Sequence, residues 1–106
     1  MPKTRRRARA LTFDDFTATL GDPAPPPELP LTLQALWHDR HGNWDRAHRI
    51  AQDIEDTTGS LIHGYLHRRE GDLPNATYWY TRAGQSLPND DTEREWERLV
   101  RSLLGA

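Results

Sequence analysis

The sequence contains no cysteine, and this absence excludes disulfides, thiolate metal ligands and cysteine nucleophiles. It also lacks any apolar run that approaches the roughly 18 residues of a membrane span. Its charged start is not followed by an apolar stretch of the kind found in secretory signals. We therefore expect a cytoplasmic protein that does not cross a membrane.

Hydrophobic residues are also scarce, at 35% of the chain, whereas charged residues make up 28%. This hydrophobic fraction is low for a globular domain. A chain of 106 residues is long enough for one domain with a small core. Four tryptophans, three tyrosines and two phenylalanines supply bulky anchors for that core.

Positive charge is concentrated at the N-terminus, where residues 3–9 hold five of the 14 basic side chains and no acidic one. The rest of the chain therefore carries 9 basic residues against all 16 acidic residues. An acidic body argues against a nucleic-acid-binding core. Any binding of nucleic acid is expected only through the basic arm at residues 3–9. The alternative is that this arm is a solubilising tail.

The first 30 residues are predicted to form a basic, proline-rich and flexible segment with a short helix at 12–20. Phe13, Phe16 and Leu20 lie on one side of this helix, which Thr12 can cap. So short a helix must dock on a surface, either in this domain or on a partner. Five of the eight prolines lie in residues 21–30, which we predict to be an extended spacer.

Residues 31–106 are predicted to form an all-α domain, because apolar side chains recur at helical spacing. The predicted helices cover about 31–41, 44–55, 60–70 and 72–86, with a final amphipathic helix that contains Trp96 to Leu104. Gly42 and Gly71 stand where a left-handed cap favours glycine, and Asn43 and Asp72 can cap the helices that follow. The inner stripe of the fourth helix is predicted to contain Leu73, Ala76, Tyr80, Ala83 and Leu87.

The sequence contains two similar units. They become apparent when Gly42 is aligned with Gly71, an offset of 29 residues. Each unit is a helix, a turn and a second helix. Neither can bury its apolar stripe alone, so the two are expected to stack. We predict two stacked antiparallel helical hairpins, with the amphipathic C-terminal helix as a cap on the stack.

The second unit resembles a tetratricopeptide (TPR) or Sel1-like repeat. The spacings of that pattern are occupied by Gly64, Gly71, Asp72, Ala76, Tyr80, Ala83 and Pro88. The first unit keeps only Gly42, Asn43, Trp44 and Ala47, and the offset is shorter than the usual ~34 residues. The resemblance implies a degenerate TPR-like array that acts as a non-enzymatic protein-interaction module.

A second resemblance covers residues 65–84, which read YLHRREGDLPNATYWYTRAG. This stretch resembles a signature of a family of small uncharacterised bacterial proteins, YLHRxEGDxxNAxYWYxRAG. The resemblance implies no activity for this chain.

A candidate protein-binding face consists of Asn75, Tyr78, Trp79 and Arg82, at spacings i, i+3, i+4 and i+7 on the fourth helix. Tyrosine, tryptophan and arginine are enriched in binding hot spots. We predict that this face contacts a protein partner. The alternative is that Trp79 packs under the last helix, with Tyr78 and Arg82 at its rim.

A candidate ligand or metal cluster consists of His63, His67 and Glu70, at i, i+4 and i+7 on one helix. Two imidazoles one turn apart can reach one metal ion, and a carboxylate can complete the set. His38 occupies the place of His67 in the first unit, and His48 lies on the inner stripe of the second helix. The alternative is a structural network in which these groups satisfy one another.

Other catalytic patterns are missing from the sequence. It contains no glycine-rich phosphate loop, no two-histidine zinc-protease pattern and no serine in a nucleophile elbow. The first prediction is therefore a non-enzymatic protein without a cofactor, whose partner and oligomeric state are left open. The rival is a small-ligand or metal-binding protein, including an enzyme, that uses the histidine cluster.

Overall fold

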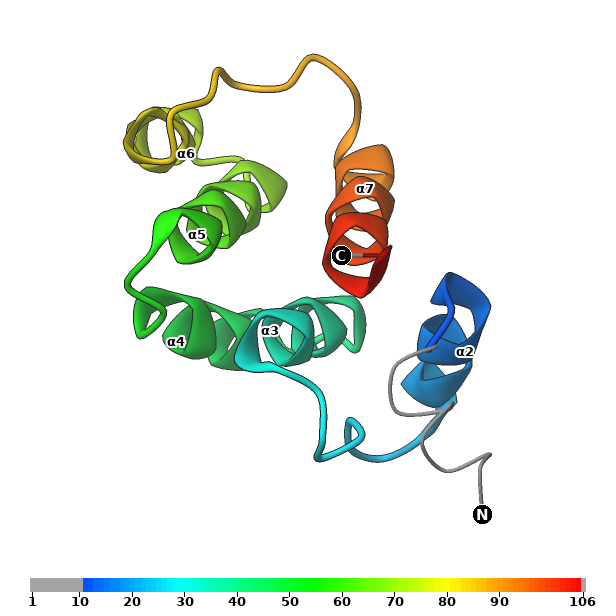
Figure 1. Cartoon of the computed structure of the whole chain (residues 1–106). Helices are drawn as coiled ribbons and strands as arrows, with labels where there is room; N and C mark the ends of the chain where they lie inside the picture. Colours follow the sequence, from blue (N-terminus) through cyan, green and yellow to red (C-terminus); the bar gives the residue numbers. More distant parts are fainter. Residues whose placement is uncertain (1–10, 106) are drawn as a thin grey trace.

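The computed structural model describes residues 11–105, and the basic arm at residues 3–9 lies outside them (Figure 1). The described residues contain helices and no strand, which confirms the all-α prediction. The elements are α2 (Phe13–Ala18), η1 (Thr19–Gly21), α3 (Leu31–Arg40), α4 (Trp44–Gln52), α5 (Thr57–Arg69), α6 (Leu73–Arg82) and α7 (Thr92–Gly105). None of these helices is long and apolar enough to cross a membrane.

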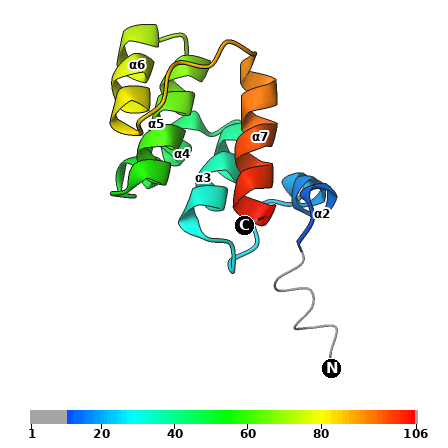
Figure 2. The ribbon, with the colours of Figure 1, turned by 45° about the horizontal axis from the view of Figure 1, so that its top comes forward.

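The helices form the predicted pair of hairpins with a C-terminal helix against them. α3 packs on α4, α5 packs on α6, and α4 lies against α5, so that the two hairpins stack. α7 contacts α3 and α5 on one side and α2 on the other, as Figure 2 shows. The connection from α6 to α7 crosses over the end of the stack (Figure 1).

The two hairpin turns have the same geometry. Gly42 and Gly71 have φ angles of +92° and +90°, in the left-handed region that favours glycine. In each turn the amide of the next residue donates to the carbonyl five positions earlier, at 2.8 Å from Asn43 and 2.9 Å from Asp72. The side chains of Asn43 and Asp72 then cap α4 and α6. The 29-residue offset in the sequence therefore corresponds to a repeated turn in the fold.

Three helix boundaries differ from the sequence prediction. α5 begins at Thr57 rather than near residue 60, because the Asp56 side chain caps the helix there. α4 ends at Gln52 rather than near residue 55. α6 ends at Arg82 rather than near residue 86, with Ala83 as its C-cap.

The predicted inner stripe of α6 is wrong at both of its ends. Leu73 and Leu87 are 47% and 38% exposed, whereas Ala76, Tyr80 and Ala83 are buried as expected. Leu73 is the first residue of α6, beside the turn. Leu87 lies beyond the end of α6, in the connection to α7.

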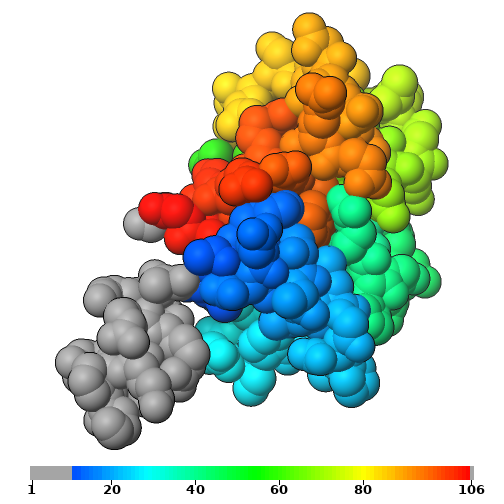
Figure 3. Space-filling view, turned by 90° about the vertical axis from the view of Figure 1, so that its right-hand side faces the viewer, coloured from blue at the N-terminus to red at the C-terminus, as the bar shows by residue number. Residues whose placement is uncertain are grey.

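The core combines α3, α5 and α7 with residues from the N-terminal part of the chain. Trp96 of α7 donates its indole N–H to the Leu36 carbonyl at 3.0 Å. The Trp96 ring also contacts Phe13 and Phe16 of α2, at centroid distances of 5.9 and 6.0 Å. Phe16 and Leu29 belong to the buried core. The short helix therefore docks on this domain, where Figure 3 shows residues 11–20 against α7.

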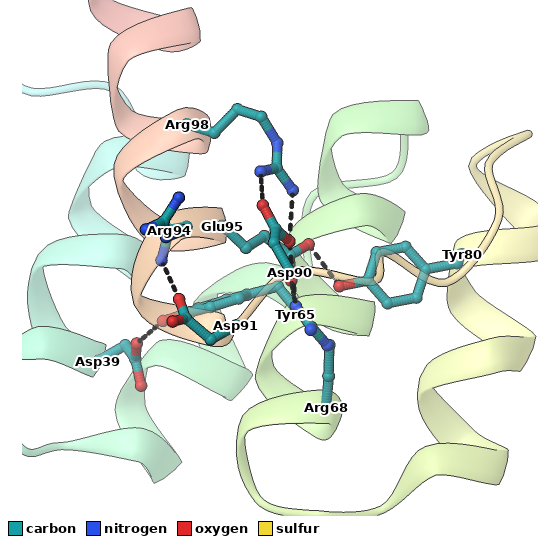
Figure 4. A network of polar contacts seen from close by, with 9 residues as sticks. All are labelled: Asp39, Tyr65, Arg68, Tyr80, Asp90, Asp91, Arg94, Glu95 and Arg98. Carbon is teal, nitrogen blue, oxygen red and sulfur yellow. Dashed lines mark hydrogen bonds and ion pairs between the residues drawn. The ribbon is translucent and has the colours of Figure 1, made fainter.

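Two buried carboxylates tie α5 to its neighbours, as Figure 4 shows in part. Asp39 of α3 accepts the Tyr65 hydroxyl at 2.6 Å. Glu95 of α7 accepts the Tyr80 hydroxyl and, at 2.7 Å, the Arg68 guanidinium. Burial and the neighbouring carboxylate raise the pKa of each tyrosine, so both hydroxyls remain protonated donors.

Candidate metal centre

Three histidines from two helices converge on one point of the α4–α5 interface. One ligand nitrogen each from His48 of α4 and from His63 and His67 of α5 lies within 4.8 Å of the other two. His63 and His67 are one turn apart on α5, which places both rings on the side that faces α4. These two rings are buried and His48 is half-buried. The structure therefore brings together three of the four histidines that the sequence singled out.

Two tryptophans flank the cluster and hold its rings in place. Trp79 of α6 stacks on His63 with centroids 3.9 Å apart and an interplanar angle of 11°. Trp44 stacks on His48 at 4.8 Å and 11°. The Trp44 indole N–H donates to the Leu66 carbonyl at 2.8 Å, which fixes the ring against α5. This role of Trp44 was not predicted from the sequence, although Trp44 and His48 stand at i, i+4 spacing there.

Glu70 orients the third ring. Its carboxylate Oε2 lies 2.8 Å from Nδ1 of His67. A carboxylate accepts, so Nδ1 is the donor in this contact, and Nε2 is the nitrogen that remains for a metal. This arrangement of carboxylate and histidine is the usual support of a metal ligand. Glu70 and Asp72 also form a second candidate group with His67, again within 4.8 Å.

The protonation state of the cluster suits metal binding. Burial lowers the pKa of His63 to about 4, and the nearby His48 and His67 act in the same direction. Burial also lowers the pKa of His48, as does His67, while Glu70 and Asp45 act against the shift. Metal ions bind the neutral imidazole. At pH 7 the His48 and His63 rings are therefore in the form that a metal requires.

His38 lies apart from this cluster. It belongs to neither of the candidate metal-binding groups found among residues 11–105. Its ring meets the edge of Trp37 at a centroid distance of 5.2 Å. Burial lowers the pKa of His38, and Arg46 and His41 add to that effect. Equivalent positions in the two repeats thus have different surroundings, and the structure does not place His38 beside His67.

Comparison of the chain with protein-family models, curated proteins and solved structures finds no match. Resemblance to TPR-like repeats therefore stays a prediction, and function has to be inferred from the geometry of the residues themselves.

The predicted protein-binding face on α6 is divided by the fold. Tyr78 is 53% exposed, and the Arg82 guanidinium donates to its hydroxyl at 3.2 Å. Trp79 turns toward His63 rather than packing under α7. The Asn75 side-chain amide donates to Asp72 at 3.4 Å, so that Asn75 belongs to the hairpin turn. Tyr78 and Arg82 are the two predicted contact residues that are exposed.

Proposed function

We propose that the protein binds a divalent transition-metal ion, with zinc as the first candidate, through His48, His63 and His67. The convergence of three ligand nitrogens within 4.8 Å carries this proposal. Ligand nitrogens around a tetrahedral zinc ion stand roughly 3.3 Å apart, given Zn–N bonds of about 2.0–2.1 Å. Binding would therefore draw the three nitrogens closer by up to about 1.5 Å, which requires the stacked rings to shift.

The hydrogen bonds of the cluster favour a metal over a closed structural network. A structural histidine pairs its ring nitrogens with protein donors and acceptors. Among the described residues, the rings of His48 and His63 make no such hydrogen bond, whereas His67 is held by Glu70. No fully buried side-chain nitrogen in residues 11–105 lacks a partner. The ring nitrogens of His48 and His63 are therefore not completely enclosed by the protein.

The test is a calorimetric titration of the metal-free protein with Zn²⁺, together with its melting temperature. Zinc is expected to bind and to raise the melting temperature, because a ligand that binds only the folded state stabilises it. His48→Gln and His63→Gln should each weaken zinc binding at least about tenfold. His38→Gln is the matched control, because His38 lies outside the cluster.

Two results would contradict the proposal. The first is a wild-type protein whose melting temperature and heats of titration do not respond to zinc. The second is an equal loss of affinity in His38→Gln and His63→Gln, since this would place the bound ion away from the cluster.

A second candidate function is the protein-interaction role that the sequence favoured. It is supported by the exposure of Tyr78, whose ring lies under the Arg82 guanidinium at 5.9 Å from the centroid. Tyrosine and arginine are enriched in binding hot spots. Affinity capture with the wild type and with a Tyr78→Ala/Arg82→Ala variant tests it. A partner that is retained equally by both proteins would show that this face is not the contact surface.

A further inference from the structure

A cavity of about 480 Å³ lies directly beside the histidine cluster. Its walls come from the end of α4, the connection from α4 to α5, the start of α5 and one face of α6. His63 and Trp79, the stacked pair of the candidate metal centre, are part of its lining. Its volume falls within the range of roughly 300–1,000 Å³ that is usual for small-molecule sites. Of the three clustered histidines only His63 lines the cavity, so a small molecule in it would meet the cluster at that ring.

The ligand count leaves a coordination position to be filled. A metal on His48, His63 and His67 has three protein ligands, and sites of this kind keep a fourth position for water or substrate. The Glu70 carboxylate is engaged by Nδ1 of His67, on the far side of that ring from Nε2. The cavity meets the cluster at His63, so a molecule bound there is a candidate for the remaining position.

The charges around the cavity indicate the kind of molecule. Arg82 is its one basic side chain apart from the histidine, whereas Glu55 and Asp56 are acidic. The hydrogen bond to Tyr78 uses one of the five N–H donors of the Arg82 guanidinium. Two charges of the metal and one of Arg82, set against two carboxylates, leave one net positive charge. This balance suits a monoanion better than a phosphate, which carries more negative charge.

We propose that the three-histidine metal centre keeps an open coordination position toward this cavity, and that the cavity binds a small monocarboxylate. The carboxylate would be shared between the metal and the Arg82 guanidinium, whose fork of donors matches it. This inference rests on the proposed metal-binding function. In the proposed function the ion joins α4 and α5. In this inference the same ion also binds a small-molecule ligand.

The test uses Co²⁺ in place of zinc, because the visible absorption of Co²⁺ reports its coordination. Sodium acetate is titrated into the Co²⁺-loaded protein, with sodium perchlorate as a control of equal ionic strength, because perchlorate coordinates metal ions very weakly. Acetate is expected to shift the absorption bands in a saturable way, and perchlorate to leave them unchanged. Arg82→Gln should weaken the acetate effect roughly tenfold or more, as the loss of a charge-assisted hydrogen bond requires. Arg98→Gln, which removes from α7 a positive charge that is paired with Asp90, should leave the acetate effect unchanged.

The outcomes separate this inference from the metal site itself. Co²⁺ bands that do not respond to acetate, or an acetate affinity that is equal in wild type and Arg82→Gln, would overturn the inference and leave metal binding intact. Failure of Co²⁺ to bind at all would overturn both.

Discussion

Arg68 and Arg69 are neighbours on α5, yet their guanidinium groups bind carboxylates on two different helices. Arg68 donates to Glu95 of α7 at 2.7 Å, and Arg69 donates to Asp39 of α3 at 2.8 Å. Each of these carboxylates also accepts a tyrosine hydroxyl. α5, which carries two of the three clustered histidines, is therefore tied to both helices by buried charge.

Loss of the Glu95 charge should destabilise the protein by about 3 kcal/mol, because Glu95 is the nearer carboxylate partner of the partly buried Arg68 guanidinium, which is then left with only the Asp90 carboxylate at 3.9 Å. The variant is Glu95→Gln, and the measurement is the free energy of unfolding in urea. Glu97→Gln on the same helix is the control. Glu97 pairs with Arg101 at the surface, where both side chains are about half exposed, so its loss should change the free energy by less than about 0.5 kcal/mol. Equal effects of the two substitutions would rule out a special role for the buried pair.

Stability of the metal-free protein should fall as the pH drops from 7.5 to 5.5. The pKa of His63 is about 4 in the folded protein and near the ordinary value of 6.5 in the unfolded chain. Between those values the unfolded chain binds more protons, so the free energy of unfolding decreases as the pH falls through this window. The expected loss from His63 alone is about 1 kcal/mol between pH 7.5 and 5.5, measured by urea unfolding. His48, whose pKa is also lowered, adds to it.

His63→Gln is the control for this pH dependence, because the amide does not titrate. Its free energy of unfolding should change less than that of the wild type over the same interval. A wild-type protein whose stability is flat from pH 7.5 to 5.5 would show that the His63 ring is not held neutral by burial.

Local patterns predicted the hairpins and part of the site. Gly42 and Gly71 predicted the positions of both turns, because a left-handed cap depends only on residues within a few positions of each glycine. The i, i+4 spacing of His63 and His67 placed them on one face for the same reason. Both signals act within one helix or one turn, so they can be read without knowing what packs against it.

The remaining features depend on contacts between distant parts of the chain. No local pattern in the sequence marks Asp39 or Glu95 as buried, yet each is 1% exposed and paired with an arginine of another helix. Trp79 was predicted to belong to a binding face, but its ring stacks on His63. His38 and His67 are equivalent by sequence offset, whereas only His67 meets other histidines. Pairings of this kind depend on how the helices pack, and the local patterns of a single sequence do not reveal that packing.

Because α2 contacts Trp96, we expect this helix to contribute to the free energy of unfolding of the domain. Phe16 is fully buried, and Phe16→Ala should lower the free energy of unfolding by about 3 kcal/mol through lost burial and a cavity. Asp14→Ala, at an exposed position of the same helix, should cost less than about 1 kcal/mol. Urea unfolding measures both. If the two variants were equally stable, α2 would contribute nothing to the core in solution.

The contact between Glu70 and His67 should matter for the metal more than for the fold. Glu70 is about two-fifths exposed, so Glu70→Gln should leave the urea unfolding of the metal-free protein almost unchanged. The same variant should weaken zinc binding about tenfold, because the carboxylate holds the proton on Nδ1 of His67 and makes Nε2 a better ligand. Calorimetric titration with Zn²⁺ measures the affinity, and Glu97→Gln controls for the loss of one negative charge elsewhere on the surface. Equal zinc affinities in the two variants would mean that Glu70 acts only through the general charge of the protein, and that His67 needs no support to bind the ion.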